Sequence, residues 1–376
     1  MKALVTYKVN SWIQEIANNL EEEFGEEFHF IKARNGEMGL INGTNSDILD
    51  HYDSLIRFGT YANYLPSANK VYNSYESIKL TSNKLKARQK FEEELVPTPE
   101  THSRREIREI LRRGREHELV FPIIAREGNH YGGNNFFVYD NPEELKEGLF
   151  VNDDLVYFSE FYPKSREFRV HIASGKAIIV AEKIVAEENQ HEYVWNLGDN
   201  GACDEFNTLR WSEYHNIEHI IATASLATKV IGLDYGAVDV IANPTSRQDE
   251  LPPVAVLEIN SAPRLEEYGI SRYTQYFKWL LKHKNERAEF KLPHELDRFS
   301  FTNSDFDNEY VRLENETDNQ ENEFESRELE EEEFFERPTR QVRDLEREVE
   351  EESRRTEELE LDRESLQRLF SDLLEM

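Results

Sequence analysis

The spacing of apolar residues divides the start of the chain into short strands and one helix. Residues 3–7 and 28–31 are short apolar runs, and residues 54–59 form a third run that is closed by a glycine. Between the first two runs, apolar residues recur every three or four positions over 11–24, which predicts an amphipathic helix. This order of elements predicts a small N-terminal α/β domain over residues 1–80.

A second pattern, in which strands alternate with helices, continues to about residue 290. Helical spacing over 77–94 ends before Pro97, and a long helix fits residues 213–230. The strands expected here follow apolar or alternating runs at 119–125, 136–139, 156–161, 168–173, 177–180, 237–242 and 254–259. We therefore predict a larger α+β domain over residues 81–290.

The end of the chain differs from the body in composition. Residues 301–376 contain 28 Asp and Glu side chains and 10 Arg side chains. Residues 291–337 are rich in Asn, Asp and Glu, so we predict an acidic, disordered linker. Over 338–376 seven of ten heptad seam positions are apolar, which predicts one long helix. That helix would either form a coiled coil, with a second copy or with a partner, or fold back on the body.

The charge of the chain argues against one class of function. There are 45 Lys and Arg residues against 76 Asp and Glu residues, which gives a formal net charge of −31. Affinity for nucleic acids comes largely from basic side chains that displace counterions, so no nucleic-acid partner is expected. The acidity of the body fits either an ordinary solvated surface or adaptation to high salt, in which carboxylates keep a protein in solution.

Neither a membrane segment nor a secretion signal is expected. No apolar run approaches the roughly 20 residues that cross a bilayer. The N-terminus also lacks the apolar stretch of a signal peptide. The single cysteine, Cys203, excludes an internal disulfide and a zinc site built from several cysteines. Together these features predict a cytoplasmic protein without a membrane partner.

Three oxygen-bearing side chains on two apolar strands form the most informative pattern. Glu258 and Asn260 are two positions apart and share a face, whereas Leu257 and Ile259 point the other way, into a core. Asp239 interrupts the other strand between two valines. Oxygen ligands on neighbouring strands suit Mg²⁺, which is usually shared between one or two carboxylates and substrate phosphates. The exposed polar face of a hairpin would show the same short pattern.

Basic residues and a glycine-rich loop precede these strands. Lys84 opens the helical stretch before Pro97, and Arg126 closes an apolar strand, where a charge tends to face a cleft. The loop that follows contains Gly132 and Gly133. Small residues of this kind let backbone N–H groups approach phosphate oxygens. Taken singly, a solvated lysine and an ordinary hairpin loop would have the same appearance.

In this order and spacing, the segments resemble the ATP-grasp superfamily and, within it, the RimK-like carboxylate–amine ligases. The resemblance covers about residues 77–285, and its strongest parts are residues 232–240, GLDYGAVDV, and residues 257–263, LEINSAP. It implies an α+β fold of the ATP-grasp type, in which two α+β subdomains clamp ATP. The small N-terminal α/β domain would precede this fold, and the acidic helical tail would follow it.

The resemblance also implies a role for each residue that matches the family pattern. The catalytic residues would be Arg169, Lys183 and Asn196. The ATP-binding residues would be Lys84 and Arg126 on the phosphates, Gly132 and Gly133 in the loop, Glu160 and Phe161 beside adenine, and Glu167 near the ribose or at the edge of the site. The metal ligands would be Asp239, Glu258 and Asn260, which would hold one or two Mg²⁺ ions, with Mn²⁺ as a substitute.

Two departures from the family pattern bear on the binding of substrates. Arg126 stands where the family usually has lysine, and it keeps the positive charge while adding a bidentate fork. Arg264 stands where the family usually has glycine, directly after residues 260–263. The pocket for the acceptor would therefore be reshaped.

The activity that the resemblance implies is ATP-dependent formation of an amide bond. A carboxylate would attack the γ-phosphate of ATP, and the acyl phosphate would react with an amine to give an amide, ADP and phosphate. The carboxylate substrate and the amine acceptor would each be a small molecule, a peptide or a protein tail. Two alternatives stay open: a non-catalytic scaffold that uses its tail for assembly, and a kinase-like enzyme that stops at the phosphorylated acid.

Overall fold

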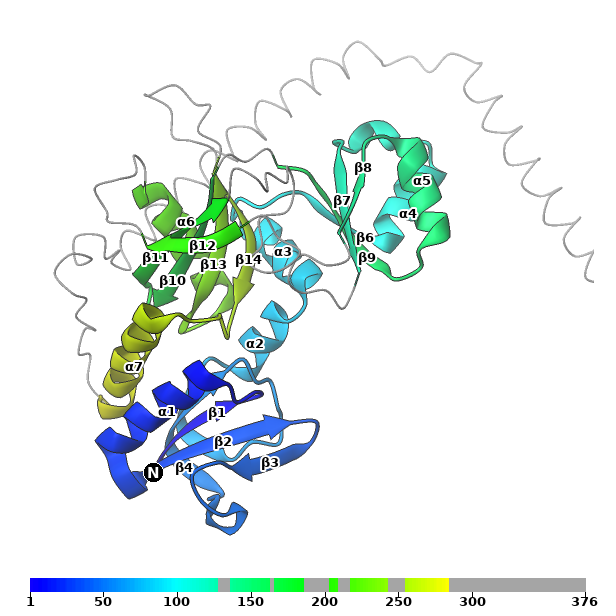
Figure 1. The fold of residues 1–376 in the computed structure, drawn as a ribbon. Coiled ribbons are helices and arrows are strands. Elements are labelled where there is room, and N and C mark those ends of the chain that lie inside the picture. The colour runs from blue at the N-terminus through cyan, green and yellow to red at the C-terminus, as the bar shows by residue number, and fades with distance from the viewer. Residues whose placement is uncertain (128–135, 163–165, 186–202, 209–216, 243–253, 284–376) are drawn as a thin grey trace, which may run out of the picture. The chain divides into compact units, whose positions relative to one another are not determined.

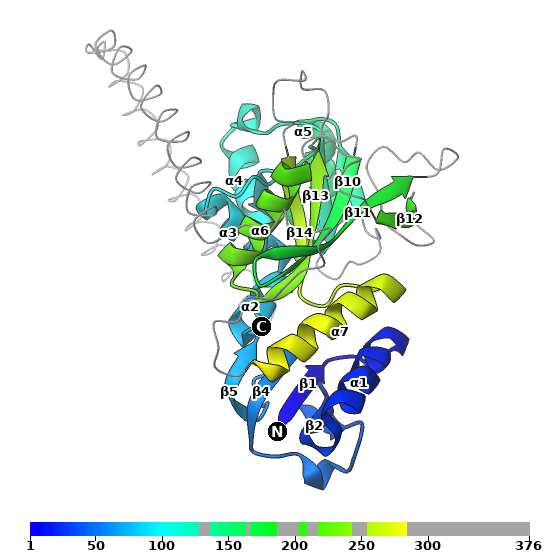
Figure 2. The ribbon, with the colours of Figure 1, turned by 90° about the vertical axis from the view of Figure 1, so that its left-hand side faces the viewer.

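The computed structural model describes residues 1–127, 136–162, 166–185, 203–208, 217–242 and 254–283. Within these residues the chain forms three sheets, each with helices packed against it (Figure 1, Figure 2). The predictions for the acidic linker and the heptad helix fall on residues 291–376, outside the described part of the chain.

The first sheet is built from N-terminal residues, and its strand order is β3-β2-β1-β4-β5. The strands are β1 (Lys2–Thr6), β2 (Phe28–Arg34), β3 (Glu37–Leu40), β4 (His51–Phe58) and β5 (Ser67–Tyr72). All neighbours are parallel except β2 and β3. Helix α1 (Ser11–Phe24) begins after Asn10, whose side chain accepts a hydrogen bond from the Ile13 amide at 3.1 Å. The helix expected over 11–24 is therefore confirmed, and the short strands β3 and β5 were not predicted.

Two short helices replace the single helix that was expected over 77–94. They are α2 (Tyr75–Thr81) and α3 (Lys84–Glu93). Between them, the Asn83 side chain accepts a hydrogen bond at 3.1 Å from the third amide of α3. An asparagine that satisfies a free amide in this way favours the start of a new helix over continuation of the old one. Lys84 is therefore the first residue of a helix.

The second sheet is antiparallel throughout, with the strand order β6-β9-β7-β8. Its elements are β6 (Thr101–Ser103), α4 (Arg104–Arg112), β7 (Ile123–Glu127), β8 (Phe136–Tyr139), α5 (Pro142–Val151) and β9 (Leu155–Glu160). Helices α4 and α5 lie on the same side of the sheet (Figure 1), where Ile107, Leu145 and Phe158 contribute to a buried core. The strand expected from residue 119 begins later, after Pro122, which has no amide hydrogen to donate to a neighbouring strand.

The third sheet is also antiparallel, with the strand order β12-β11-β10-β13-β14. Its elements are β10 (Arg166–Ala173), β11 (Lys176–Val185), β12 (Cys203–Thr208), α6 (Ile217–Ile231), β13 (Tyr235–Ala242), β14 (Val254–Asn260) and α7 (Glu267–Lys282). Helix α6 packs against β13 and β14 through an apolar face that includes Ile220, Ile221 and Ala224. No helix in the described ranges is both long enough and apolar enough to cross a membrane.

The strand pairing of the third sheet is interrupted at three places, one of which lies between β11 and β12, at Ile184 and Val185. Between β10 and β11 the register shifts between His171 and Ile172. Between β13 and β14 it shifts directly after Asp239, where Leu257 is the additional residue. A bulge changes which side chains face each other across two strands. Leu257, expected in the core, is half-buried at this bulge, whereas Ile259 is buried as expected.

Asn73 joins the end of the first sheet to the start of β13. Its amide donates to the Asp234 carboxylate at 2.6 Å, and its side-chain oxygen accepts from the Asp234 amide at 2.8 Å. The Asn73 side chain also donates to the Tyr235 carbonyl at 2.9 Å. Asn73 has a φ of 60°, a left-handed conformation that asparagine adopts more readily than most residues. These buried bonds fix the start of the strand that carries Asp239.

Gly59 brings the end of β4 next to the loop that follows β14. Its φ is +69°, and a Cβ atom there would lie only 2.4 Å from the Cβ of Ala262. Glycine is the residue that combines this backbone conformation with so close an approach. The segment 260–263 therefore lies against the carboxyl end of a strand of the first sheet.

Candidate functional site

The candidate site is built on one face of the third sheet. In the register of the strands, Arg169 of β10 lies opposite Asp239 of β13, and Asp239 lies opposite Glu258 of β14. Residues directly opposite one another in a sheet point to the same face. Asn260 follows Glu258 by two positions and shares that face. The sheet therefore brings four of the predicted site residues together.

Asp239 is held by two cations. Arg169 donates to both of its carboxylate oxygens, from Nε to Oδ1 and from Nη2 to Oδ2, each at 2.7 Å. Lys183 Nζ lies 3.3 Å from Oδ2. Burial alone would raise the pKa of Asp239, but the charges of Arg169 and Lys183 outweigh burial and lower it. The carboxylate is therefore ionised at neutral pH and has a fixed orientation.

Lys183 also forms an ion pair with Glu167, from the neighbouring strand. The side chains of Lys183 and Glu167 are only 2% and 4% exposed. Burial would lower the pKa of Lys183, but the charges of Asp239 and Glu167 raise it above its ordinary value. A charge buried this deeply is tolerated when it is paired. Lys183 is therefore a cation with two carboxylate partners.

Glu258 forms an ion pair with Lys84, the first residue of α3. Burial would raise the pKa of Glu258, but the Lys84 ammonium beside it holds the pKa well below its usual range. Asn260 Nδ2 donates to Glu258 Oε1 at 3.1 Å. The oxygen of the Asn260 amide is then the atom of that side chain that could bind a cation.

Arg126 lies on β7, in the second sheet. Its guanidinium carbon lies 5.2 Å from the centre of the Phe136 ring, a distance typical of a cation–π contact. Burial lowers the pKa of Arg126, and the charges of Tyr157 and Glu258 partly offset this effect. Arg126 is therefore within electrostatic reach of a predicted metal ligand.

Glu160 and Phe161 lie at the end of β9, where the chain leaves the second sheet. The Glu160 carboxylate accepts a hydrogen bond from the Glu100 amide at 3.2 Å. The Phe161 amide donates to the Pro122 carbonyl at 2.9 Å. The remaining predicted site residues, Gly132, Gly133 and Asn196, lie outside the described residues.

Arg88 has a supporting position that was not predicted. It is 8% exposed and lies one helical turn after Lys84 on α3. Its Nε donates to the carbonyl of the bulged Leu257 at 3.0 Å, and its Nη1 donates to Thr101 Oγ1 at 3.2 Å. Arg88 thus holds α3 against β14 beside Glu258. The signal in the sequence is its spacing of four from Lys84, which puts both side chains on one helix face.

Arg264, the second residue at which the sequence departs from the ATP-grasp pattern, lies on the surface between β14 and α7. Its side chain is exposed, and no ion pair to it is present among the residues that the structure describes. It follows Ala262, the residue that touches Gly59, by two positions. The backbone that precedes Arg264 therefore lies close to the carboxyl end of β4.

The oxygen donors on the third sheet fit Mg²⁺ once another anion engages the cations that pair with them in the structure. In the described ranges, no three His, Cys, Asp or Glu side chains form a group that could hold a metal ion. The predicted set is two carboxylates and one amide, Asp239, Glu258 and Asn260, and hard oxygen donors of this kind suit Mg²⁺. Because Arg169 and Lys84 engage both carboxylates, these cations would have to turn to another anion before the carboxylates bind a metal.

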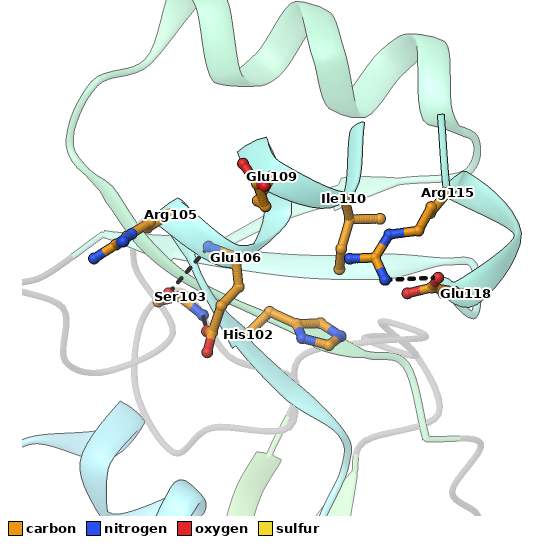
Figure 3. A pocket seen from close by; sticks show the side chains of 8 residues that line it. All are labelled: His102, Ser103, Arg105, Glu106, Glu109, Ile110, Arg115 and Glu118. Atoms are coloured by element: carbon orange, nitrogen blue, oxygen red, sulfur yellow. Dashed lines mark hydrogen bonds and ion pairs between the residues drawn. The ribbon is translucent and has the colours of Figure 1, made fainter. Parts of the chain in front are cut away.

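A separate hollow of about 560 Å³ lies beside α4. Figure 3 shows His102, Ile110 and Arg115 among the residues that line it. Arg115 pairs with Glu118, its neighbour three positions along the chain, at 3.1 Å. None of the residues predicted for the site lines this hollow.

The comparison with known sequences gives one distant relative. No family model matches the chain. The "Uncharacterized protein MG011 homolog" of Mycoplasma pneumoniae (strain ATCC 29342 / M129 / Subtype 1) is 27% identical over 129 residues. This match covers 34% of the chain and 41% of the relative, so it spans less than half of the relative's length.

Solved structures are similar over more of the chain. The VanG D-Ala:D-Ser ligase from Enterococcus faecalis matches 76% of this chain over 99% of its own length, with a TM-score of 0.52 and 14% identity. The ATP-grasp ligase PsnB, solved with a minimal precursor, matches 74% of this chain over 98% of its own, with a TM-score of 0.49 and 13% identity. At such low identity the likeness concerns the fold alone. The α+β fold expected from the sequence is confirmed for the described part of the chain, which has the same overall fold as the VanG D-Ala:D-Ser ligase.

Proposed function

We propose that this chain is an ATP-dependent carboxylate–amine ligase of the RimK-like type, which forms an amide through an acyl phosphate. The observation that supports this most is the convergence of acidic, basic and amide side chains beside one face of the third sheet. Those side chains are Lys84, Glu167, Arg169, Lys183, Asp239, Glu258 and Asn260. They come from segments far apart in the sequence, and three cations next to metal-binding oxygens suit a nucleoside triphosphate.

The phosphates of ATP bind to Lys84, Arg126 and Arg169. Lys84 and Arg169 are paired with Glu258 and Asp239 in the structure, and a nucleotide brings the negative charge that can take over these cations. The freed carboxylates, with Asn260, would hold Mg²⁺, and the ion would neutralise charge on the transferring phosphoryl group. Nucleotide and metal therefore bind together, and free metal binds weakly.

The chain's own residues position the substrates and stabilise developing charge. An oxygen of the substrate carboxylate attacks the γ-phosphorus as its bond to ADP breaks, and Arg169 and Lys183 would stabilise the developing charge. The amine nitrogen then attacks the acyl carbon, phosphate leaves, and the proton from nitrogen passes to solvent. Asn196, Gly132 and Gly133 complete the site by resemblance to the family. The carboxylate and the amine are small molecules, peptides or protein tails.

The experiment that tests this function is a screen for ADP release. The full chain is incubated with ATP, Mg²⁺ and paired sets of carboxylates and amines, at low and at high salt. We expect ADP only when both a carboxylate and an amine are present. ADP from a carboxylate alone would favour the kinase-like alternative, and nucleotide binding without ADP release in any pair would favour the scaffold.

A further inference from the structure

Glu167 has surroundings that differ from those of a nucleotide ligand. Its residue is 3% exposed, and its carboxylate pairs with the ammonium of Lys183, which is itself almost fully buried. A group that recognises the ribose of a bound nucleotide needs a face open to that nucleotide. The structure therefore favours a role for Glu167 that acts through its partner.

Lys183 connects Glu167 to a predicted metal ligand. Its Nζ pairs with Glu167 Oε1 and lies 3.3 Å from Asp239 Oδ2. The same Oδ2 accepts a hydrogen bond from Arg169 Nη2 at 2.7 Å. Asp239 therefore interacts with two cations, Arg169 and Lys183. The strength of its interaction with Lys183 depends on how strongly the Lys183 ammonium also interacts with Glu167.

We propose that Glu167 is a positioning residue, which holds Lys183 and so fixes how tightly Lys183 engages Asp239. This inference rests on the proposed function, because it assumes that Asp239 binds the metal that accompanies ATP. Partners of this kind, one step behind a metal ligand, orient the ligand and tune its affinity for the ion.

Removal of the Glu167 charge has a defined consequence. In Glu167→Gln the buried ammonium of Lys183 keeps one anionic partner among those described, Asp239, and moves toward it. Asp239 is then less able to turn to a metal ion, so the affinity for metal falls while the nucleotide contacts stay in place. Glu167→Asp retains the charge on a shorter side chain and should restore most of that affinity.

The chain offers a matched control on the same strand. Glu182 precedes Lys183, and its carboxylate lies 3.3 Å from Arg166 Nε in an ion pair of its own. Because neighbouring residues of a strand point to opposite faces, Glu182 lies on the face away from Lys183. Glu182→Gln removes one carboxylate charge, as Glu167→Gln does, but from the strand that carries Lys183, and it leaves the pair of Glu167 and Lys183 intact.

The test measures binding of Mn²⁺ by electron paramagnetic resonance, with a non-hydrolysable ATP analogue present. We expect Mn²⁺ affinity to fall by roughly 10–100-fold in Glu167→Gln, as is typical when the partner of a metal ligand is lost. Glu167→Asp and Glu182→Gln should remain close to the wild type. The ratio of affinities for ATP and 2′-deoxyATP, measured without metal, should be the same in all four proteins.

The outcomes separate this inference from the proposed function. A wild-type chain that binds no Mn²⁺ with the analogue would overturn both. Wild-type affinity for Mn²⁺ in Glu167→Gln would overturn the positioning role alone. Loss of the preference for ATP over 2′-deoxyATP in Glu167→Gln would also overturn the positioning role, because it would indicate that Glu167 contacts the ribose. If Glu167→Gln does not fold, Lys183→Arg, which keeps the charge but alters its geometry, gives the same measurement and the same expected loss.

Discussion

Two regions of this molecule are rich in paired basic and acidic side chains, yet they differ in geometry and in burial. On α4, Glu109 pairs with Arg112 at 2.8 Å and with Arg113 at 2.5 Å, and the two arginine side chains are 70% and 56% exposed. On the third sheet, Lys183 and Asp239 have side chains that are 2% and 4% exposed. The partners on α4 are three or four positions apart in the chain, whereas those on the sheet come from different strands.

The difference in burial determines how strongly the charges of each region interact. Exposed pairs within a helix are screened by water and salt and contribute little to stability. Buried charges interact strongly, and the loss of one partner leaves the other uncompensated. The hollow beside α4 (Figure 3) is lined by charges of the first kind. The face of the third sheet, in contrast, carries buried charges that interact strongly.

The largest expected effect is the loss of activity in Glu258→Ala and in Asn260→Ala. Each variant removes a predicted metal ligand, and Glu258→Ala also removes the described partner of Lys84. We expect ADP release to fall by at least roughly 10²–10³-fold, because charge at the transferring phosphoryl group is no longer stabilised. The assay is ADP release, with a circular dichroism spectrum to verify folding. Turnover near the wild-type rate in both variants would contradict the assignment of the metal ligands.

The next effect is on stability. Lys183→Met leaves the buried carboxylates Glu167 and Asp239 without their common cation. We expect the free energy of unfolding to fall by roughly 3–5 kcal/mol, a loss typical of removing one partner from a buried ion pair. Urea denaturation followed by tryptophan fluorescence measures this change. An unfolding midpoint equal to that of the wild type would show that the buried charges are not coupled.

A smaller effect depends on pH and on His171. This side chain is buried, with Nδ1 3.1 Å from Tyr273 Oη, and burial together with the charge of Arg169 lowers the pKa of His171 from 6.5 to about 3. Asp239 acts in the opposite direction and only partly offsets them. Between these two pH values the unfolded chain binds a proton at His171 that the folded chain does not bind. The contribution of His171 to stability is therefore complete above about pH 6.5 and is lost as the pH falls toward 3.

Urea denaturation at several pH values measures this contribution. Between about pH 7 and pH 5, His171→Gln should reduce the dependence of the free energy of unfolding on pH. His29, whose pKa burial also lowers, accounts for part of the slope that remains. Equal slopes in the wild type and in His171→Gln would rule out this role for His171.

The smallest effect is expected at α4, in Glu109→Gln. This substitution removes the partner of Arg112 and Arg113, all on the surface of one helix. We expect no measurable change in the unfolding midpoint or in ADP release, because water and salt replace the lost interaction. A fall in the free energy of unfolding as large as that expected for Lys183→Met would contradict the distinction between exposed pairs on α4 and buried pairs on the third sheet.

Local patterns point to Asp239, Glu258 and Asn260 as candidate ligands, and the other candidate residues follow from the family resemblance, but neither source reveals which side chains pair with them. Asp239, Glu258 and Asn260 stand out because a strand alternates two faces, and this needs only the neighbouring sequence. The hairpin of β10 and β11 turns at Ser174 and Gly175, both with positive φ. Turn residues of this kind can also be recognised in a sequence.

The register beyond that turn is what the sequence does not reveal. Ala173 pairs with Lys176, and an uninterrupted register from there would place Glu182 opposite Glu167. Because the register shifts after His171, Lys183 takes the position opposite Glu167, and the Lys183 ammonium points toward the candidate site. A bulge of this kind depends on the packing of the whole sheet, so spacing alone cannot predict it.

The balance of charge in the candidate site affects how a nucleotide approaches it. Beside the third sheet, three acidic side chains, Glu167, Asp239 and Glu258, formally cancel three basic ones, Lys84, Arg169 and Lys183. Arg126 of β7 adds one positive charge, whereas the net charge of the whole chain is −31. A polyanion would therefore be repelled at a distance and attracted only at close range. Salt screens the distant repulsion beyond about 8–10 Å and affects contacts inside the site much less. Capture of ATP should therefore become faster as ionic strength rises, the reverse of the trend in proteins that draw in nucleotides with a basic surface.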